Sequence, residues 1–154
     1  HRVMECLNYS KAGSTEDIKN EIDRMVREEK LSLKQAECIK LKDIDTFAGS
    51  SIGERIKRAY AYGGVKREQP FVFEYDRQLV QGVIDLYFIE DGQLVIVDYK
   101  TDRVLRGRAG EDELRRRYSI QLDYYAMALS QITGLKVKEK VIYSFALGRS
   151  LTVE

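Results

Sequence analysis

The sequence predicts an α/β (α+β) fold, with an N-terminal helical region followed by a mixed central sheet that is flanked by helices. Apolar residues recur at helical spacing in the first part of the chain, and from Pro70 onward the period changes to two. A further helical stretch then separates the third predicted strand from the last one. A helix between two strands is typical of a parallel crossover, which predicts a mixed sheet.

Short helices are expected before Gly63 and Gly64, which stop the helical region. In the second of these helices Ser14 or Thr15 can cap the N-terminus, and two acids follow at the positive end of the helix dipole. The predicted helices are 1–9, one that starts at the Ser14 or Thr15 cap, 32–39, 43–48 and 51–60.

The rest of the chain is predicted to form a three-stranded meander, a helix and a last strand. The helix, 118–132, carries one apolar stripe and stops at Gly134. The segment 103–117 before it is expected to be an arginine-rich loop. The predicted strands are 71–75, 79–88, 94–99 and 140–147, and the predicted stripe is Leu122, Tyr125, Leu129 and Ile132.

Composition excludes some classes of protein. Charged residues make up 33% of the chain, above the average of about 25%, but the net charge of +1 indicates no particular partner. No apolar run approaches the roughly 18 residues of a membrane-spanning helix, so no membrane association is expected. Cys6 and Cys38 match no metal-ligand spacing and are expected to be reduced thiols, as in a cytoplasmic protein.

The segment GVIDLYFIEDGQLVIVDYKTD, residues 82–102, places two acids in an apolar hairpin. Asp91-Gly92 is a strong signal for a two-residue turn. A loop of two or four residues puts Asp85 across from Asp98, whereas a three-residue loop would break that register. Opposed Cβ atoms lie about 4.5–5.5 Å apart, and two carboxylates at that distance repel by roughly 3 kcal/mol at an effective dielectric of 20. The pair therefore needs a cation or a shared proton.

Lys100 follows Asp98 by two residues, so both side chains point to the same face of the strand. One lysine offsets two acids only in part. A hard divalent cation with carboxylate and water ligands does so better, and the Tyr99 carbonyl can add an oxygen. A polar, solvent-facing strand is the simpler alternative. The residues that share this face argue against it, since they include Val83, Tyr87 and Ile96.

This pattern resembles the PD-(D/E)XK nuclease motif, and more narrowly the RecB-like nuclease domain at the C-terminal end of AddA-type helicase–nuclease subunits. The segments that carry the resemblance are HRVME (1–5), REQPF (67–71), LVQGVIDL (79–86), VDYKTD (97–102) and QLDYYA (121–126), the last matching a Gln-x-x-x-Tyr signature. The resemblance implies a restriction-endonuclease-like core. It also implies one nuclease domain over 1–154, with 1–64 mainly helical and 65–154 holding the catalytic sheet, as a fragment of a larger helicase–nuclease.

The resemblance also implies roles for individual residues. The implied metal ligands are His1, Asp85, Asp98 and the Tyr99 carbonyl, and the implied catalytic residues are Asp85, Asp98, Lys100, Gln121 and Tyr125. The implied cofactor is Mg²⁺, with Mn²⁺ able to substitute because a histidine ligand suits Mn²⁺ better. Sister subunits hold an iron–sulfur cluster on four cysteines, so no cluster is expected with two.

Three assignments have plain alternatives. His1 is the first residue and the only histidine, which also fits the remnant of a tag. Tyr125 lies on an apolar stripe, so it fits an ordinary core residue equally well. Glu68 fits either an acid next to the metal site or DNA, or an ordinary surface position at the start of a strand.

The implied activity is hydrolysis of phosphodiester bonds in DNA, on a single-stranded end or tail that a fused helicase produces during double-strand-break repair. A second helicase–nuclease subunit is the implied partner, and the bacterial cytoplasm, near the nucleoid, is the implied location. Between Lys100 and Tyr118, seven basic residues outnumber four acidic ones, which favours phosphate contact. Bases could stack on one of three tyrosines, Tyr99, Tyr118 or Tyr124.

Two other functions fit the same fold. A non-catalytic nuclease-fold module would bind DNA or a partner protein, but degenerate modules lose the acids or the lysine that this chain keeps. An independent endonuclease is disfavoured by the Gln-x-x-x-Tyr helix and by the histidine of the first helix. No Walker motif G-x-x-x-x-G-K-[ST] occurs in the chain, so it supplies no ATPase.

Overall fold

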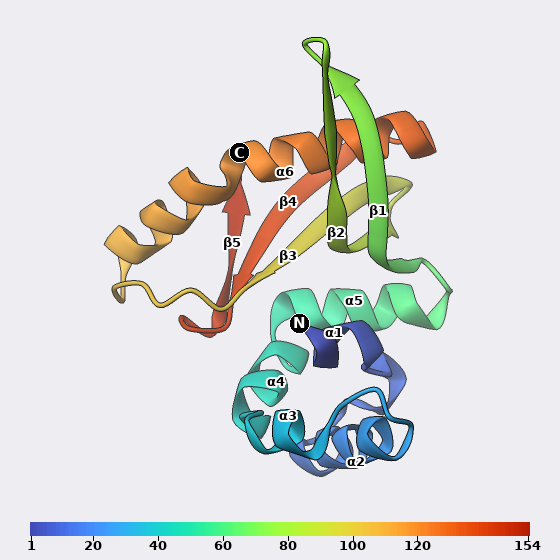
Figure 1. Cartoon of the computed structure of the whole chain (residues 1–154), viewed down its shortest axis with the longest axis vertical. Helices are drawn as coiled ribbons and strands as arrows, with labels where there is room; N and C mark the ends of the chain where they lie inside the picture. Colours follow the sequence, from blue (N-terminus) through green and yellow to red (C-terminus); the bar gives the residue numbers. More distant parts are fainter. The chain divides into compact units, whose positions relative to one another are not determined.

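In the computed structural model, which describes residues 1–154, the chain forms two compact units. His1–Gly63 is helical, and Gly64–Glu154 holds a five-stranded sheet with one long helix packed on it (Figure 1). The predicted α+β class with a mixed sheet is confirmed. That the two units act as a single domain stays a prediction. None of the helices combines the length and the apolar character needed to cross a membrane.

The helical unit is built from short elements with serine caps. Ser14 accepts a hydrogen bond from the backbone N–H of Asp17 at 3.1 Å, as predicted, and Ser32 forms a capping box with Gln35. Each cap satisfies backbone groups that the first helical turn leaves without partners. The elements are α1 (Arg2–Cys6), the 3₁₀ turn η1 (Tyr9–Lys11), α2 (Thr15–Arg27), α3 (Leu33–Glu37), α4 (Leu41–Ala48) and α5 (Ser51–Ala61).

The sheet unit has the strand order β1-β2-β3-β4-β5. Two tight turns, Asp76-Arg77 and Asp91-Gly92, have positive φ at both central residues, which matches the twist of the strands they join. β3 and β4 are parallel, and the other neighbours are antiparallel, so the predicted crossover is confirmed. The elements are β1 (Val65–Tyr75), β2 (Gln78–Glu90), β3 (Gln93–Lys100), α6 (Arg108–Thr133), β4 (Val137–Ser144) and β5 (Arg149–Val153).

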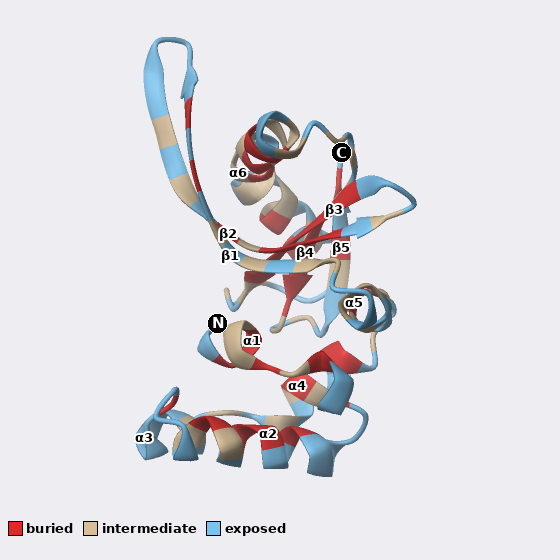
Figure 2. Ribbon diagram, turned by 90° about the vertical axis from the view of Figure 1, so that its right-hand side faces the viewer, coloured by how far each residue is buried: buried red, intermediate tan, exposed pale blue.

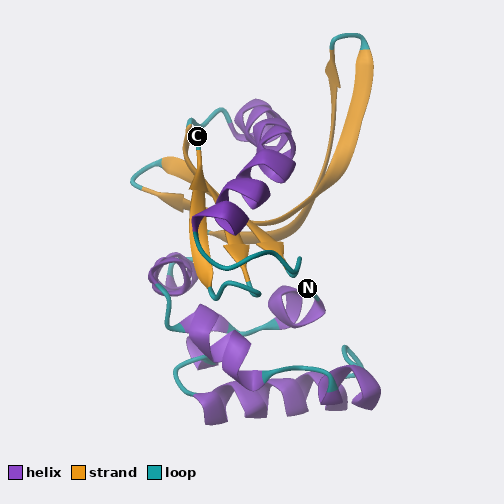
Figure 3. Cartoon of the chain, turned by 90° about the vertical axis from the view of Figure 1, so that its left-hand side faces the viewer, coloured by secondary structure: helices purple, strands orange, loops and turns teal.

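The core of this unit lies between one face of the sheet and α6 (Figure 2). The distal part of the β1–β2 hairpin extends beyond the other strands (Figure 3). Its aromatic side chains still pack on α6, since the Tyr75 and Tyr124 rings are 5.6 Å apart. Asp98 is the one buried charged residue of the unit. The buried cluster includes Phe71, Phe73, Ile84, Tyr87, Ile96, Leu114, Leu122, Tyr125, Leu129 and Ile142.

The prediction of an arginine-rich loop over 103–117 is wrong, because α6 begins at Arg108. Its first turns are stabilised by ion pairs one turn apart, which join Arg108 to Asp112 and Glu113 to Arg117. Among residues 108–117, only Leu114 has a large buried apolar side chain. The helical periodicity was therefore too weak to detect from the apolar residues alone.

Two further predictions at the C-terminal end need correction. The last strand, predicted as 140–147, is β4, and it is followed by a tight turn and a fifth strand, β5, that was not predicted. Gly148 makes the turn possible with φ of 65°, and its N–H donates to the Ser144 carbonyl at 2.8 Å. The apolar stripe of α6 ends at Leu129, because Ile132 is 54% exposed.

Candidate active site

The hairpin between β2 and β3 has the register expected for a loop with an even number of residues. Its pairs run from Glu90↔Gln93, next to the two-residue turn, to Leu86↔Val97. The ladder stops there, one step before the two acids. At that point Oδ2 of Asp85 accepts a hydrogen bond from the backbone N–H of Tyr99 at 2.8 Å. A side chain thus continues the contact between the strands where the backbone ladder ends.

The Asp98 carboxylate is almost completely buried, with 1% of the residue exposed. Burial raises the pKa of its carboxyl from 3.8 to about 6, the nearby Asp85 charge adds to this rise, and Lys100 opposes it. Nζ of Lys100 lies 2.8 Å from Oδ2 of Asp98. The same oxygen has no well-directed hydrogen-bond donor. Lys100 thus compensates the charge of this oxygen through the ion pair alone, and a buried carboxylate with one such partner can also accept a cation.

Lys100 connects the end of β3 to α6. Its ammonium forms the ion pair with Asp98, donates to Oε1 of Gln121 at 3.1 Å, and lies 4.0 Å from the centre of the Tyr118 ring. These three contacts surround a group that has three protons to donate. These contacts therefore hold the end of the lysine side chain in one place.

The Gln-x-x-x-Tyr pair continues this network along α6. Nε2 of Gln121 donates to the hydroxyl of Tyr125 at 2.6 Å, as the spacing of four residues on a helix allows. Burial raises the pKa of Tyr125, and the charges of Asp98, Asp85 and Glu68 raise it further, so the phenol is neutral. One network thus runs from Asp98 through Lys100 and Gln121 to Tyr125. Tyr125 belongs to the core as well as to this network, and its catalytic role stays a prediction.

Tyr118 and Asp102 take part in the site in a way that the sequence did not reveal. Beneath the Lys100 ammonium, the Tyr118 hydroxyl donates to Oδ1 of Asp102 at 2.7 Å. Burial, followed by the contact with Asp102, raises the pKa of Tyr118. Asp102 closes the VDYKTD segment, so its place in that motif was the available signal.

Glu68 occupies an unusual place in β1. Its neighbours pair as Arg67↔Leu86 and Gln69↔Ile84, but Glu68 itself is left out of the ladder opposite Asp85. Its φ of 49° is in the left-handed region, which is costly for a residue with a side chain. Glu68 is exposed, as the surface interpretation predicts, but it is the fourth residue of β1 and not its first.

The other predicted residues are placed as follows. His1 is exposed at the N-cap position of α1, in the helical unit, and its carbonyl accepts the N–H of Met4 at 2.7 Å. Metal binding by His1 and by the Tyr99 carbonyl stays a prediction. The Tyr99 ring is 3% exposed and packs near Phe145, so the prediction that it stacks on a base is wrong.

The acid pair fits a hard divalent cation. Within the sheet unit no third His, Cys, Asp or Glu side chain completes a cluster around Asp85 and Asp98. Mg²⁺ is commonly held by one or two carboxylates, with water and substrate phosphate completing its ligands. Two carboxylates, one of them buried with an oxygen that lacks a directed donor, match this donor set.

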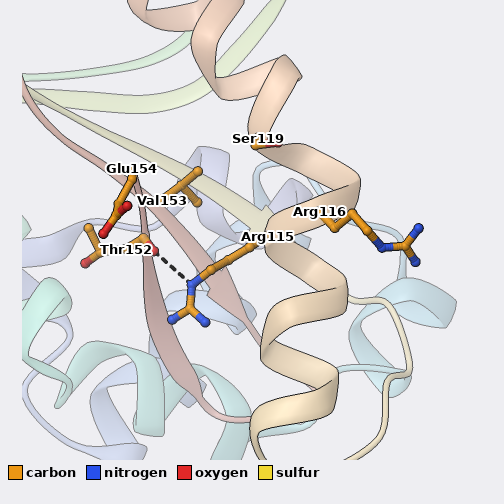
Figure 4. A pocket seen from close by; sticks show the side chains of 6 residues that line it. All are labelled: Arg115, Arg116, Ser119, Thr152, Val153 and Glu154. Atoms are coloured by element: carbon orange, nitrogen blue, oxygen red, sulfur yellow. Dashed lines mark hydrogen bonds between the residues drawn. The ribbon is translucent and has the colours of Figure 1, made fainter.

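Two cavities border α6. One, of about 660 Å³, lies between α6 and the end of β5, where Nε of Arg115 donates to the Thr152 carbonyl at 3.1 Å (Figure 4). It is lined by none of the acids or the lysine of the site. The other, of about 340 Å³, is lined by residues of the β1–β2 hairpin and of α6, among them Gln121 and Tyr125. The smaller cavity is therefore the one that adjoins the candidate site.

Comparisons with known proteins agree with this geometry. Residues 1–151 match the model of the PD-(D/E)XK nuclease superfamily. Curated relatives include ATP-dependent helicase/nuclease subunits of Clostridium novyi, 35% identical over 94% of this chain, and of Thermoanaerobacter sp., 40% identical over 98% of it. This chain spans 13% of the length of each relative.

A solved chain from Eubacterium rectale, described as a putative exonuclease, superposes with a TM-score of 0.47 at 16% identity, covering 88% of this chain and 54% of that one. The family assignment rests on the family model and on the curated relatives. The mixed five-stranded sheet is consistent with a restriction-endonuclease-like core. Because the family model matches nearly the whole length, the chain belongs to the PD-(D/E)XK nuclease superfamily and is homologous to a segment of these ATP-dependent helicase/nuclease subunits.

Proposed function

We propose that the chain is the nuclease domain of an ATP-dependent helicase–nuclease and hydrolyses phosphodiester bonds in DNA with a divalent cation. The observation that carries this proposal is the buried Asp98 carboxylate, ion-paired to Lys100 beside Asp85, at the point where β2 and β3 stop pairing. A buried acid beside a second acid and a lysine in an apolar hairpin is the kind of charge cluster that marks a functional site.

Asp85 and Asp98 would hold Mg²⁺ or Mn²⁺, with His1 and the Tyr99 carbonyl as further ligands by analogy with the family. The bound cation would lower the pKa of a coordinated water and polarise a phosphate oxygen of the substrate. The protein keeps Asp98 beside Asp85 through the Tyr99 N–H contact, so the two carboxylates are already assembled before a cation binds.

Lys100 would stabilise negative charge on the phosphate in the transition state and orient the attacking water. The contacts with Asp98, Gln121 and the Tyr118 ring fix the position of the ammonium. A charge held in place in this way needs little reorganisation during the reaction.

Gln121 and Tyr125 would act as positioning residues. Gln121 accepts from Lys100 and donates to Tyr125, so the amide has one orientation that satisfies both contacts. The Tyr125 ring is packed 5.6 Å from the Phe71 ring, which anchors the far end of the network in the core.

The substrate in this proposal is a single-stranded end or tail of DNA, supplied by the helicase part of a longer protein during double-strand-break repair. A second helicase–nuclease subunit is the proposed partner, in the bacterial cytoplasm. Arg103, Arg106 and Arg116 support contact with DNA, because each is exposed and forms no ion pair within the chain.

Degradation of single-stranded DNA with Mg²⁺ or Mn²⁺ tests the proposal. Asp98→Ala and Lys100→Ala are expected to abolish cleavage, while Lys138→Ala, which removes a lysine from an ion pair with Glu90 on the same sheet, is the matched control and should cut like the parent. Cleavage that survives both site variants would sink the proposal. A parent chain that binds DNA and Mn²⁺ but never cuts would instead favour the non-catalytic module.

A further inference from the structure

The smaller cavity beside α6 has features that the proposed chemistry does not use. It is a groove of about 340 Å³ between the β1–β2 hairpin and α6. This volume is at the lower end of the range for pockets that bind small organic molecules. Gln121 lines it and also holds Lys100, so the groove is continuous with the candidate active site.

One face of α6 supplies a wall of the groove. Arg117, Ile120 and Tyr124 recur at intervals of three and four residues, which puts them on the same side of the helix. Ile120 is 65% exposed, so its apolar side chain is accessible to a ligand in the groove. The half-buried Tyr124 ring is held at its edge by Phe73, 6.1 Å away between ring centres, and by Tyr75.

The opposite wall is fixed by the hairpin. Phe71 packs against Gly82 on the paired strand, where an added Cβ would come within 3.0 Å of the Phe71 ring. Any other residue at position 82 would therefore require that ring to shift. The groove therefore depends on a cross-strand contact between an aromatic ring and a glycine.

We propose that this groove is a subsite for one unpaired nucleotide of single-stranded DNA, with its base against Tyr124 and Ile120. The inference rests on the proposed nuclease function. A stacked base suits the walls because every base offers an aromatic face and stacking on protein aromatics is tolerant of sequence. The nucleotide would be a neighbour of the one whose phosphate reaches Lys100.

The charge of the groove agrees with an anionic occupant. Arg117 is its one basic lining residue, and no acid lines it. Arg117 also forms ion pairs with Asp102, at 3.5 Å, and with Glu113. A phosphate would therefore share the Arg117 guanidinium with these two carboxylates. We therefore assign most of the binding to stacking on Tyr124 and less to charge.

Short oligothymidylates that carry a single 2-aminopurine, moved one position at a time, test the subsite in EDTA, where no cleavage occurs. With the parent chain, the fluorescence of 2-aminopurine should be quenched at one position by stacking. Tyr124→Leu, which keeps an apolar side chain on Phe73, should remove this quenching and weaken binding about tenfold. Ile120→Glu should do the same by adding negative charge to an exposed position.

Ile132→Glu is the matched control, because Ile132 is an exposed isoleucine at the C-terminal end of α6, outside the groove, and the change should leave quenching and affinity unchanged. Quenching at no position, or quenching that persists in both groove variants, overturns the subsite. Cleavage of DNA by the parent with Mn²⁺ is measured in parallel. A parent that cuts but shows no quenching loses the subsite alone, whereas one that shows quenching but never cuts loses the nuclease function alone.

Discussion

Oδ2 of Asp85 accepts the backbone N–H of Tyr99 at 2.8 Å, where β2 and β3 stop pairing. The contact takes the place of a backbone hydrogen bond and ties Asp85 to the strand that carries Asp98 and Lys100. On its other side, β3 continues to pair with β4 as far as Lys100↔Ser144. The acid pair is thus held by a local contact on one side and by a parallel ladder on the other.

Asp85→Asn and Asp85→Ala should separate the structural and metal-binding roles of this side chain. Asparagine keeps an oxygen for the Tyr99 N–H but loses the negative charge, so Mn²⁺ affinity should fall at least about tenfold without loss of stability in EDTA. Alanine also leaves the N–H without that acceptor, and should lower the free energy of unfolding by about 1–2 kcal/mol.

Calorimetric titration with Mn²⁺ and urea unfolding in EDTA measure the two effects. Equal stability of the Asn and Ala variants would show that the contact with Tyr99 contributes nothing. The same titration on His1→Ala tests whether the histidine is a ligand, since unchanged affinity would exclude it.

The hairpin and its register could be predicted from the sequence because Asp91-Gly92 is a local signal that determines loop length. The first turns of α6 could not, since ion pairs such as Arg108–Asp112 leave no apolar periodicity to detect. Sequence reasoning also missed β5, whose alternation is only five residues long. The first failure concerns a segment stabilised by charge pairs, and the second a strand too short to show a clear period.

In the candidate site, too, some features could be predicted from the sequence and others could not. The family resemblance identified five site residues, which the structure brings together. They are Asp85, Asp98, Lys100, Gln121 and Tyr125. The contacts of Tyr118 with Lys100 and Asp102 depend on where α6 packs, which no local pattern encodes. The left-handed backbone of Glu68 was equally invisible, because glutamate does not favour positive φ.

Without a cation, Asp98 should make the protein less stable as pH rises. Burial raises the pKa of its carboxyl from the ordinary value of 3.8, which applies to the unfolded chain, to about 6 in the folded protein. Between these values the folded protein holds a proton that the unfolded chain has released. The contribution is therefore fully present below the ordinary pKa and is lost as pH rises through about 6. The total change is about 3 kcal/mol.

Urea unfolding in EDTA on both sides of this range should show the decrease, and Asp98→Asn should flatten it. Asp123→Asn, which alters an exposed acid of α6, is the control and should keep the slope. A parent whose stability rises over the same range would contradict the assignment. Added Mg²⁺ should restore stability at the high-pH end, because the cation binds only the ionised carboxylate.

Gln121→Leu should lower kcat on single-stranded DNA by about tenfold to a hundredfold, because it removes the acceptor that positions the Lys100 ammonium. KM should change less than kcat, since the substrate keeps its other contacts. Gln131→Leu, at an exposed position of the same helix, is the matched control. Steady-state kinetics that show an unchanged kcat for Gln121→Leu would remove Gln121 from the positioning network.

The salt dependence of DNA binding should identify which arginines contact phosphate. Arg106 and Arg116 are exposed and unpaired, and Figure 4 shows the Arg116 side chain directed away from Arg115 and Thr152. Arg115 instead pairs with Asp112 at 3.2 Å and donates to the Thr152 carbonyl. Each phosphate contact that is lost should reduce the slope of log affinity against log salt by about 0.7 for a single strand.

Arg106→Ala combined with Arg116→Ala should therefore flatten the slope by about 1.4, whereas Arg115→Ala, the control, should leave it unchanged. Fluorescence anisotropy of a labelled oligothymidylate in EDTA, at several salt concentrations, gives the slope directly. Equal slopes for all these variants would place the DNA backbone on another face of the sheet unit. A loss of slope in Arg115→Ala alone would mean that DNA displaces the carboxylate of Asp112 from that guanidinium.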